Sequence, residues 1–580
     1  MKRSIFFSAV TCAALAVAAG FGGPMQTAFA QSDPAQIDSA QVPPLDSSEA
    51  ASQPVAVVSL SGVAGLGNAA VYLSEAAGQP ATGGMFATMA RGFTTGIDPN
   101  RPIGLILNMK DGAPAPLLFV PSQDIKVFLR RMEGQLGPAE ELEDDPNTLV
   151  IAAGASLLYI KQAGDWAFAA QDREALSDLP ADPLKMLGGL HETYDIAARL
   201  NVQRVPAAQR EMLIAALKQG FQEGMARQAA AAGGDDEAAN EARRVAEASI
   251  AQLEREIQNT ESLMFGFAAD RERERAFIDV VATAVEGSDT ADIYENTFAL
   301  PSKFASVIRP EAAAYYHASA SVSPKAVQRM RDSIDQSMQT YLRQLDRLEE
   351  LNEAQKEELT GFLRRFVELA IDTVSEGKVD VGAQLDLGDS GPKMFGGAFV
   401  SDGSDVADLL KGLAEKLQGD PQMPTFSFDE GKYQEITLHT VTVKIADKEV
   451  AEVLGDELTI KLGTGPDAVY FAAGSEAEAT LKQLIDSGAE DPAGAQRPLG
   501  QFYMSLTPFA RMVERVAPGE IVSAVLQAAE NSDQTDRVLV VTSKVPRGQA
   551  FRLIIGEGIF RAAGAGAAAA GQAQPAGAEF

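Results

Sequence analysis

The three histidines, His191, His317 and His439, are the side chains in this chain best suited to metal binding or acid–base chemistry. They lie far apart in the sequence, and none belongs to an HxH, HxxxH or HExxH pattern. A three-histidine metal site would therefore require the fold to bring all of them together. We predict no metal site, and we expect His439, in an alternating strand at 436–445, to lie at the surface.

The motifs of nucleophilic and cofactor chemistry are also missing from the sequence. It contains no GxSxG elbow, P-loop or EF-hand loop. Gly62, Gly65 and Gly67 follow an apolar strand, but they lack the GxGxxG spacing, and no acidic residue stands about 20 residues further on. These glycines predict a turn and close packing, so we expect no cofactor.

The single cysteine, Cys12, lies in the N-terminal segment. If that segment is removed, the remaining chain has no thiolate nucleophile, no disulfide and no cysteine-based metal site. Its stability must then come from a hydrophobic core, which a chain of this length can bury.

Acidic residues cluster at 140–145 and at 235–237. A calcium site would need their oxygens to converge on one point, so we interpret both clusters as solvated loops. A pair of distant carboxylates for glycoside hydrolysis stays open as an alternative, with no catalytic residue assigned. The formal net charge of −31 disfavours nucleic-acid binding and favours solubility.

The N-terminus has the order of a secretory signal. Lys2 and Arg3 precede a mostly apolar run at 5–23, and Ala28-Phe29-Ala30 fits the pattern of a cleavage site. Its strongest apolar stretch, Ile5 to Ala19, is diluted by polar residues and is shorter than the roughly 20 apolar residues of a membrane span. We predict a signal peptide at 1–30, a periplasmic or extracellular location, and no membrane span after cleavage.

Low-complexity segments flank the folded part. Residues 31–54 are rich in Ser, Pro, Gln and Ala and predict a disordered tether. Residues 562–580 form an Ala/Gly-rich tail that we also expect to be disordered.

Two long segments have helical periodicity. One covers 206–261 with a break at Gly233-Gly234, and the other covers 324–374. Each predicts a helical hairpin with one apolar face, which would pack on its own domain or bind a partner as a coiled coil.

The chain also contains a weak internal repeat. Residues 103–114 align with 381–392, sharing Gly104/Gly382, Leu107/Leu385, Asp111/Asp389 and Pro114/Pro392. Four further matches follow in the same order: 124–129 with 405–410, 166–170 with 469–473, 194–202 with 502–507, and 276–279 with 550–553. We therefore predict two related domains, at 55–300 and 312–561. The hairpin-like links predict an α+β fold of mainly antiparallel sheet covered by helices.

This layout loosely resembles uncharacterised exported bacterial proteins with duplicated sheet-and-helix domains. The signal, the hairpins and the segments 96–104, 166–176 and 469–481 carry the resemblance. It covers most of the chain, has no diagnostic motif and implies no activity.

Together these features predict an exported, non-enzymatic binding or structural protein of the cell envelope. Its partner stays unassigned, with an envelope component or another protein as the candidates. Two alternatives stay open: a secreted hydrolase with carboxylate catalytic residues, and a protein-interaction module that uses the helical hairpins.

Overall fold

The computed structural model describes residues 54–573 apart from 111, 154–155, 232–249, 252, 347–352, 390, 418–423, 446–450, 452–453 and 489–496. The predicted signal, most of the predicted tether and the break at Gly233-Gly234 lie outside these residues. The described chain forms two compact units. The first unit runs to Ala291 and includes Val545–Ala550; the second comprises Asp292–Lys544 and the chain from Phe551 onward.

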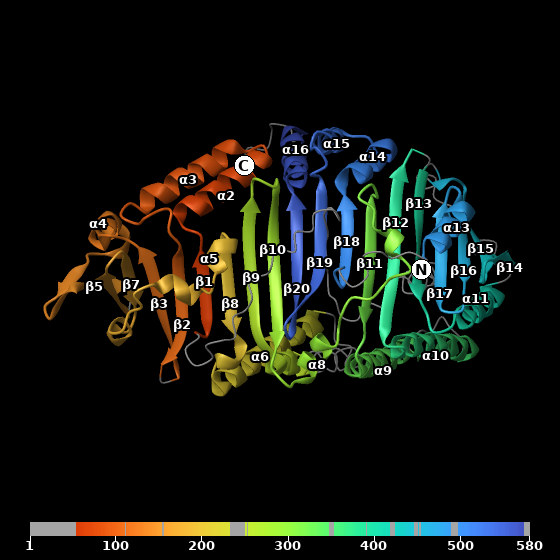
Figure 1. The fold of residues 1–580 in the computed structure, drawn as a ribbon, viewed down its shortest axis with the longest axis horizontal. Coiled ribbons are helices and arrows are strands. Elements are labelled where there is room, and N and C mark those ends of the chain that lie inside the picture. Colours follow the sequence, from red (N-terminus) through yellow and green to blue (C-terminus); the bar gives the residue numbers. More distant parts are fainter. Residues whose placement is uncertain are drawn as a thin grey trace. The chain divides into compact units, whose positions relative to one another are not determined.

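The fold class is α+β. The strands pair with each other in antiparallel fashion, and helices surround them (Figure 1). In the first unit the strands are ordered β4-β5-β6-β7-β3-β2-β1-β8-β9-β10 across the sheet. Their bounds are β1 Ala56–Leu60, β2 Ile103–Lys110, β3 Ala113–Pro121, β4 Glu140–Leu142, β5 Asp145–Ala153, β6 Ser156–Ala163, β7 Trp166–Ala170, β8 Ile196–Asn201, β9 Thr260–Asp270 and β10 Arg275–Ala284.

Helices of the first unit connect these strands. The α-helices are α2 Val63–Ala76, α3 Pro80–Phe93, α4 Ile125–Leu136, α5 Leu190–Thr193, α6 Ala207–Ala231 and α8 Asp289–Glu295, which crosses the unit boundary. Gly62 has φ of 101° directly before α2, which confirms the predicted turn at this glycine. A Cβ on Gly83 of α3 would lie 2.6 Å from the carbonyl oxygen of Ala70, so the close approach of α3 to α2 requires glycine there.

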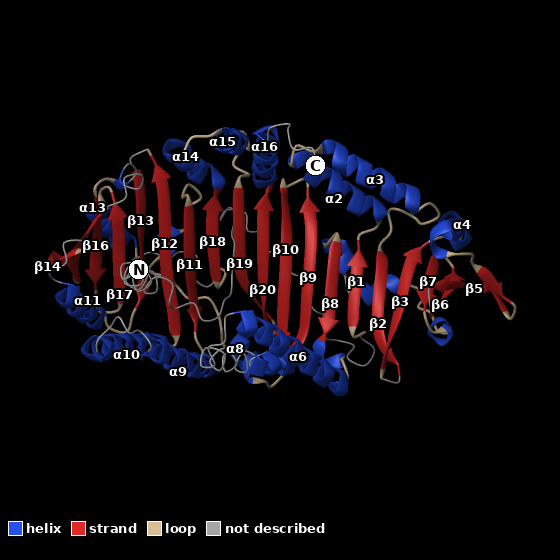
Figure 2. Cartoon of the chain, turned by 180° about the vertical axis from the view of Figure 1, so that it is seen from behind, coloured by secondary structure: helices blue, strands red, loops and turns tan. Residues whose placement is uncertain are grey.

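In the second unit the strands are ordered β14-β15-β16-β17-β13-β12-β11-β18-β19-β20, and the pairs are again antiparallel (Figure 2). Their bounds are β11 Ala314–Ser321, β12 Lys378–Gly388, β13 Gly391–Phe399, β14 Thr425–Tyr433, β15 Ile436–Lys444, β16 Glu457–Thr464, β17 Ala468–Gly474, β18 Gly500–Ser505, β19 Arg537–Val545 and β20 Gly548–Gly556, the last of which crosses the unit boundary.

The helices of the second unit include the long segment predicted at 324–374, which forms two helices in contact with each other. The bounds are α9 Pro324–Asp346, α10 Glu353–Ser375, α11 Gly403–Leu417, α13 Ala477–Ser487, α14 Leu506–Val516, α15 Glu520–Glu530 and α16 Glu557–Ala573. None of the described helices combines the length and the apolar character that a membrane crossing requires.

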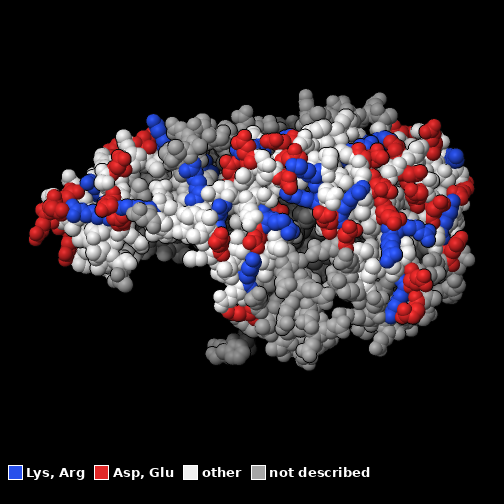
Figure 3. Space-filling view, turned by 90° about the horizontal axis from the view of Figure 1, so that it is seen from below, with Lys and Arg blue, Asp and Glu red and all other residues white. Residues whose placement is uncertain are grey.

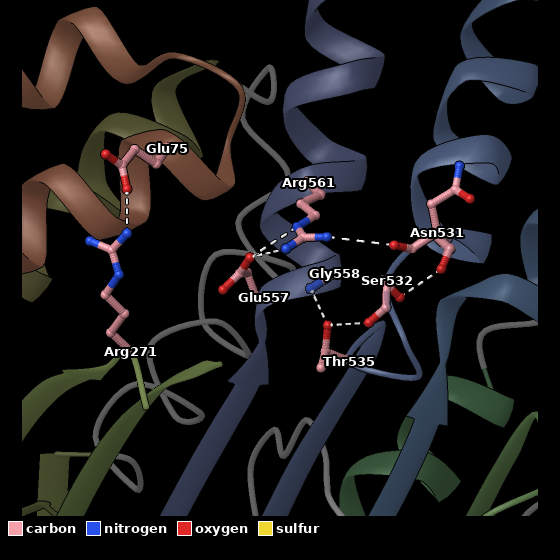
Figure 4. A network of polar contacts seen from close by, with 9 residues as sticks. Glu75, Arg271, Asn531, Ser532, Thr535, Glu557, Gly558 and Arg561 are labelled. Atoms are coloured by element: carbon pink, nitrogen blue, oxygen red, sulfur yellow. Dashed lines mark hydrogen bonds and ion pairs between the residues drawn. The ribbon is translucent and has the colours of Figure 1, made fainter. Parts of the chain in front are cut away.

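The prediction of disorder from residue 562 is wrong as far as Ala573, because α16 runs through this segment. Arg561 holds the start of α16 by bonding Glu557 from its Nε atom at 2.9 Å. The backbone N–H of Gly558 also donates to Thr535 Oγ1 at 3.0 Å (Figure 4). Small residues then let α16 lie close to α15: a Cβ on Gly566 would meet Val525 at 3.0 Å. Tertiary packing thus orders an alanine-rich stretch whose composition alone indicates disorder.

The core of the first unit lies on one face of its sheet. Val57, Ile106, Ala197 and Val281 are fully buried there, together with Tyr194 and residues of the short helical turns at 173–176 and 183–187. Neighbouring residues along each strand point to the opposite face, since side chains alternate in a strand.

Candidate functional site

The opposite face of the first unit's sheet is also apolar, yet it is not buried. Along β9, buried Met264 is flanked by Leu263 and Phe265, each 42 % exposed. Along β2, buried Ile106 is flanked by Leu105, which is 37 % exposed, and by half-buried Leu107. In a soluble protein the alternating partners of core residues are usually polar, so this face is unusual.

The strand register aligns the apolar side chains into three rows across β3, β2, β1, β8, β9 and β10. We call these residues the open face, and none of them is buried. The rows are Pro116-Leu107-Ala56-Leu200-Leu263-Ala282, Leu118-Leu105-Val58-Ala198-Phe265-Val280 and Ile103-Leu60-Ile196-Phe267-Ile278.

The open face offers no polar group to a ligand. Its side chains carry no hydrogen-bond donor or acceptor. Strands β1, β2, β8 and β9 each pair with a strand on both sides, so their backbone groups are used within the sheet. With six strands about 4.8 Å apart and three rows two residues apart, the face covers on the order of 600 Å². That is at the upper end of the largest apolar patch on an ordinary monomer.

Helix α4 covers the continuation of the same face. The middle row runs on through Ala169 of β7, Ile160 of β6 and Leu149 of β5. Ile125 and Leu129 of α4 pack against these strands, and both are 4 % exposed. Beyond β3 none of the open-face side chains is buried, so they stay accessible.

Helix α3 adds a second accessible apolar surface in the first unit. It lies at one end of the strands, beside α2 (Figures 1 and 2). Met85, Phe86, Met89 and Phe93 are 62 %, 50 %, 53 % and 46 % exposed. The three- and four-residue steps place Met85, Phe86, Met89 and Phe93 along one side of the helix. Methionine-rich surfaces of this kind adapt to ligands of different shape.

The corresponding face of the second unit is more fully covered. Val406 and Leu410 of α11 and Leu369 of α10 pack in one cluster with Val381, Ala398 and Val469. Tyr316, on the same face of β11, is half-buried, and burial raises its pKa. The open apolar surface is therefore concentrated in the first unit.

The second unit contains a buried polar cluster formed by Ser302, His317 and Asp380. Ser302 Oγ lies 2.9 Å from His317 Nε2 and donates to Asp380 Oδ1 at 2.5 Å. The backbone N–H groups of Lys303 and Phe304 donate to Asp380 Oδ2 and Ser302 Oγ at 2.9 and 3.0 Å. The cluster borders a cavity of about 440 Å³, together with Lys378, which lies 3.7 Å from the centre of the Phe399 ring.

The geometry of this cluster favours a structural role. In a catalytic Ser-His-Asp arrangement the imidazole accepts the serine proton and the carboxylate orients the imidazole. Here the carboxylate of Asp380 itself accepts the hydroxyl proton, and the serine oxygen accepts a backbone N–H. These bonds tie the segment before β11 to β12. Nearby, burial and the charges of Asp467 and Asp380 raise the pKa of Tyr470 to about 12.

The prediction that His439 lies at the surface is wrong, because its side chain is fully buried. Its Nδ1 atom accepts the N–H of Asp429 at 3.1 Å, and Nε2 lies 2.9 Å from Thr464 Oγ1. The alternating pattern of β15 identified the strand, but the irregular part of β14 covers this side, where the Phe428 and His439 rings have centres 5.6 Å apart. His191 lies in the first unit, beside Glu192.

Within the described residues, no group of three acidic, histidine or cysteine side chains is arranged to hold a metal ion. The acidic cluster at 140–145 forms ion pairs instead, with Asp144 bonded to Arg173 and Asp145 bonded to Lys161. Hydrogen bonds from these cations lower the pKa of both carboxyls. Acidic and basic side chains are interspersed on the surface drawn in Figure 3. The cluster at 235–237 lies outside the described residues.

Sequence reasoning missed the open face. The signal was present in runs such as 103–107 and 263–267, which are apolar at successive positions. Such runs predict a strand covered on both faces, and only the structure shows which face stays uncovered. Comparison with known proteins finds no match among family models, curated proteins or solved structures.

Proposed function

We propose that this chain is an exported, non-enzymatic binding protein of the cell envelope, and that the open face of the first unit holds an apolar ligand. One observation carries the proposal: three rows of aliphatic and aromatic side chains lie accessible on a single sheet face. Leaving this much apolar surface in water costs free energy, and a ligand that covers it regains that cost.

Export to the periplasm or beyond is supported by the N-terminal sequence, with its basic start, apolar run and Ala-Phe-Ala site.

We also propose that the two units arose by duplication of one plan. The support is that both units have the same order of ten strands, with β1 to β10 of the first replaced by β11 to β20 of the second. All five aligned segment pairs fall on equivalent elements, for example β2 with β12 and α4 with α11. The helical hairpins belong to this proposal, as additions placed differently in each copy.

The proposed binding face can be tested with anilinonaphthalene sulfonate, a dye that fluoresces when it leaves water. We expect the folded protein to bind the dye, and we expect Phe265→Asp to weaken binding at least tenfold. Phe298→Asp is the matched control, because Phe298 is 51 % exposed but lies in the second unit. The proposal fails if the folded protein leaves the dye dark, or if both variants bind it equally.

A further inference from the structure

We propose that the occupants of the open face are the acyl chains of phospholipids, an inference that rests on the proposed binding function. Three alternatives compete for such a surface: a lipid chain, a second copy of this protein, and a different protein. The chemistry and the size of the face separate them.

A protein partner fits the open face poorly, because protein interfaces carry about one hydrogen bond per 100–200 Å². A surface of roughly 600 Å² should then offer several bonding groups, and these rows offer none. The backbone groups of β1, β2, β8 and β9 are taken up by sheet pairing. A hydrocarbon chain is an occupant that needs no bonding group at all.

The size of the face points the same way. A stable dimer buries about 800 Å² on each partner, which exceeds the roughly 600 Å² that the rows provide. A lipid chain has no such minimum. Its affinity grows with each methylene removed from water, by up to about 0.8 kcal/mol.

The open face presents side chains of different size. Ala56 and Ala198 lie on the central strands β1 and β8, where Leu200 and Ile196 are each 38 % exposed. An acyl chain is flexible and can follow this uneven surface. The accessible Met85 and Met89 of α3 are flexible side chains in the same unit that can adapt to chains of different length.

No charged side chain belongs to the open face, so it has no counter-ion for a phosphate or a carboxylate. The structure thus favours recognition of the chains, with the headgroup remaining in water. Among chain-bearing molecules we commit to phospholipids, because the width of six paired strands accommodates two chains side by side.

The test uses short-chain phosphatidylcholines with two chains of six, seven or eight carbons, below their micelle concentrations, and titration calorimetry on the whole protein. Lengthening both chains by one carbon adds two methylenes, each about half covered on an open face. We expect binding to tighten about fourfold per step. Glycerophosphocholine, the headgroup without chains, should not bind. Affinity that is independent of chain length would overturn the inference.

Variants locate the binding and distinguish the phospholipid inference from the proposed binding function. Phe265→Asp and, separately, Leu105→Asp should each weaken binding of the eight-carbon lipid at least tenfold, whereas Phe298→Asp should leave it unchanged. Thermal melting verifies that each variant is folded. Dye binding that depends on Phe265, without any lipid binding, would overturn the phospholipid inference but leave the proposed function standing. Loss of both would overturn both.

Two further measurements address the competing occupants. Light scattering across a concentration series should detect no dimer of the protein. A dimer that Phe265→Asp dissociates would assign the face to a second copy of the chain. An amphipathic helical peptide should bind more weakly than the eight-carbon lipid. Tighter, Phe265-dependent peptide binding would assign the face to a protein partner.

Discussion

The Oγ atom of Ser302 lies 2.5 Å from Oδ1 of Asp380, across 78 residues of sequence. Both side chains are at least nine-tenths buried, and this bond joins the chain before β11 to the strand β12. A buried carboxylate requires such partners, because leaving its charge unsolvated and unbonded is costly.

Replacement of Ser302 by alanine removes this donor and leaves the Phe304 N–H without its acceptor oxygen. We expect Ser302→Ala to lower the free energy of unfolding by about 1–3 kcal/mol, as measured by urea denaturation. Ser177→Ala, at an exposed hydroxyl, should change it by less than about 0.5 kcal/mol. If the cluster were catalytic rather than structural, Ser302→Ala would leave stability intact and abolish turnover of an ester substrate.

Gly266 is a position in β9 where any side chain would collide with a fixed ring. A Cβ there would lie 2.4 Å from Cε1 of Tyr194, and the Tyr194 hydroxyl is held by Asp279 Oδ2 at 2.7 Å. We expect Gly266→Ala to destabilise the protein by about 1–3 kcal/mol through overpacking. Gly134→Ala, in helix α4 with open space around it, should instead stabilise by up to about 1 kcal/mol. Equal effects at the two glycines would contradict this account.

Arg199 lies on the buried face of β8 between Val57 and Met264 and is 9 % exposed. In the part of the chain that the structure describes, its Nε atom has no hydrogen-bond partner, and burial lowers the pKa of the guanidinium. A buried guanidinium nitrogen that forms no hydrogen bond is unfavourable. We expect Arg199→Met to raise the free energy of unfolding by about 1–3 kcal/mol, measured by denaturant titration.

A matched control for Arg199 is Arg130→Met, at an exposed position on α4, which should be nearly neutral. A clear loss of stability in Arg199→Met would mean that the guanidinium makes a favourable contact in solution, and the account above would be wrong.

His439 gives the protein a dependence on pH whose sign follows from its surroundings. Burial lowers the pKa of His439 below its ordinary value of 6.5, and the nearby carboxyl of Asp429 only partly offsets this. As the pH falls, His439 therefore binds a proton more readily in the unfolded chain than in the folded chain. We expect stability to fall as the pH drops from about 7.5 to about 5.5.

The contribution of His439 can be isolated by comparing unfolding curves of the protein and of His439→Gln over the same pH range. Glutamine cannot titrate, so the slope should flatten in the variant. An unchanged slope would place the pH dependence at another group.

Much of the fold could be predicted from local patterns. The hairpin of β2 and β3 follows from two apolar runs around a turn that contains Gly112, which has φ of 79°. The helices α9 and α10 follow from apolar residues at three- and four-residue steps. These signals depend on neighbours along the chain, and this is why single-sequence reasoning finds them.

The sequence alone therefore determined the class of elements, the antiparallel pairing of adjacent strands and the positions of the glycines that turns require. The tertiary structure alone decided what each strand face meets. Leu263, Met264 and Phe265 are equally apolar in the sequence, but Met264 is buried and its two neighbours are not. The same holds for His439, whose burial depends on how β15 packs against β14 and β16. Whether a strand face is shielded from water depends on how other elements pack against it, and a local sequence pattern does not contain that information.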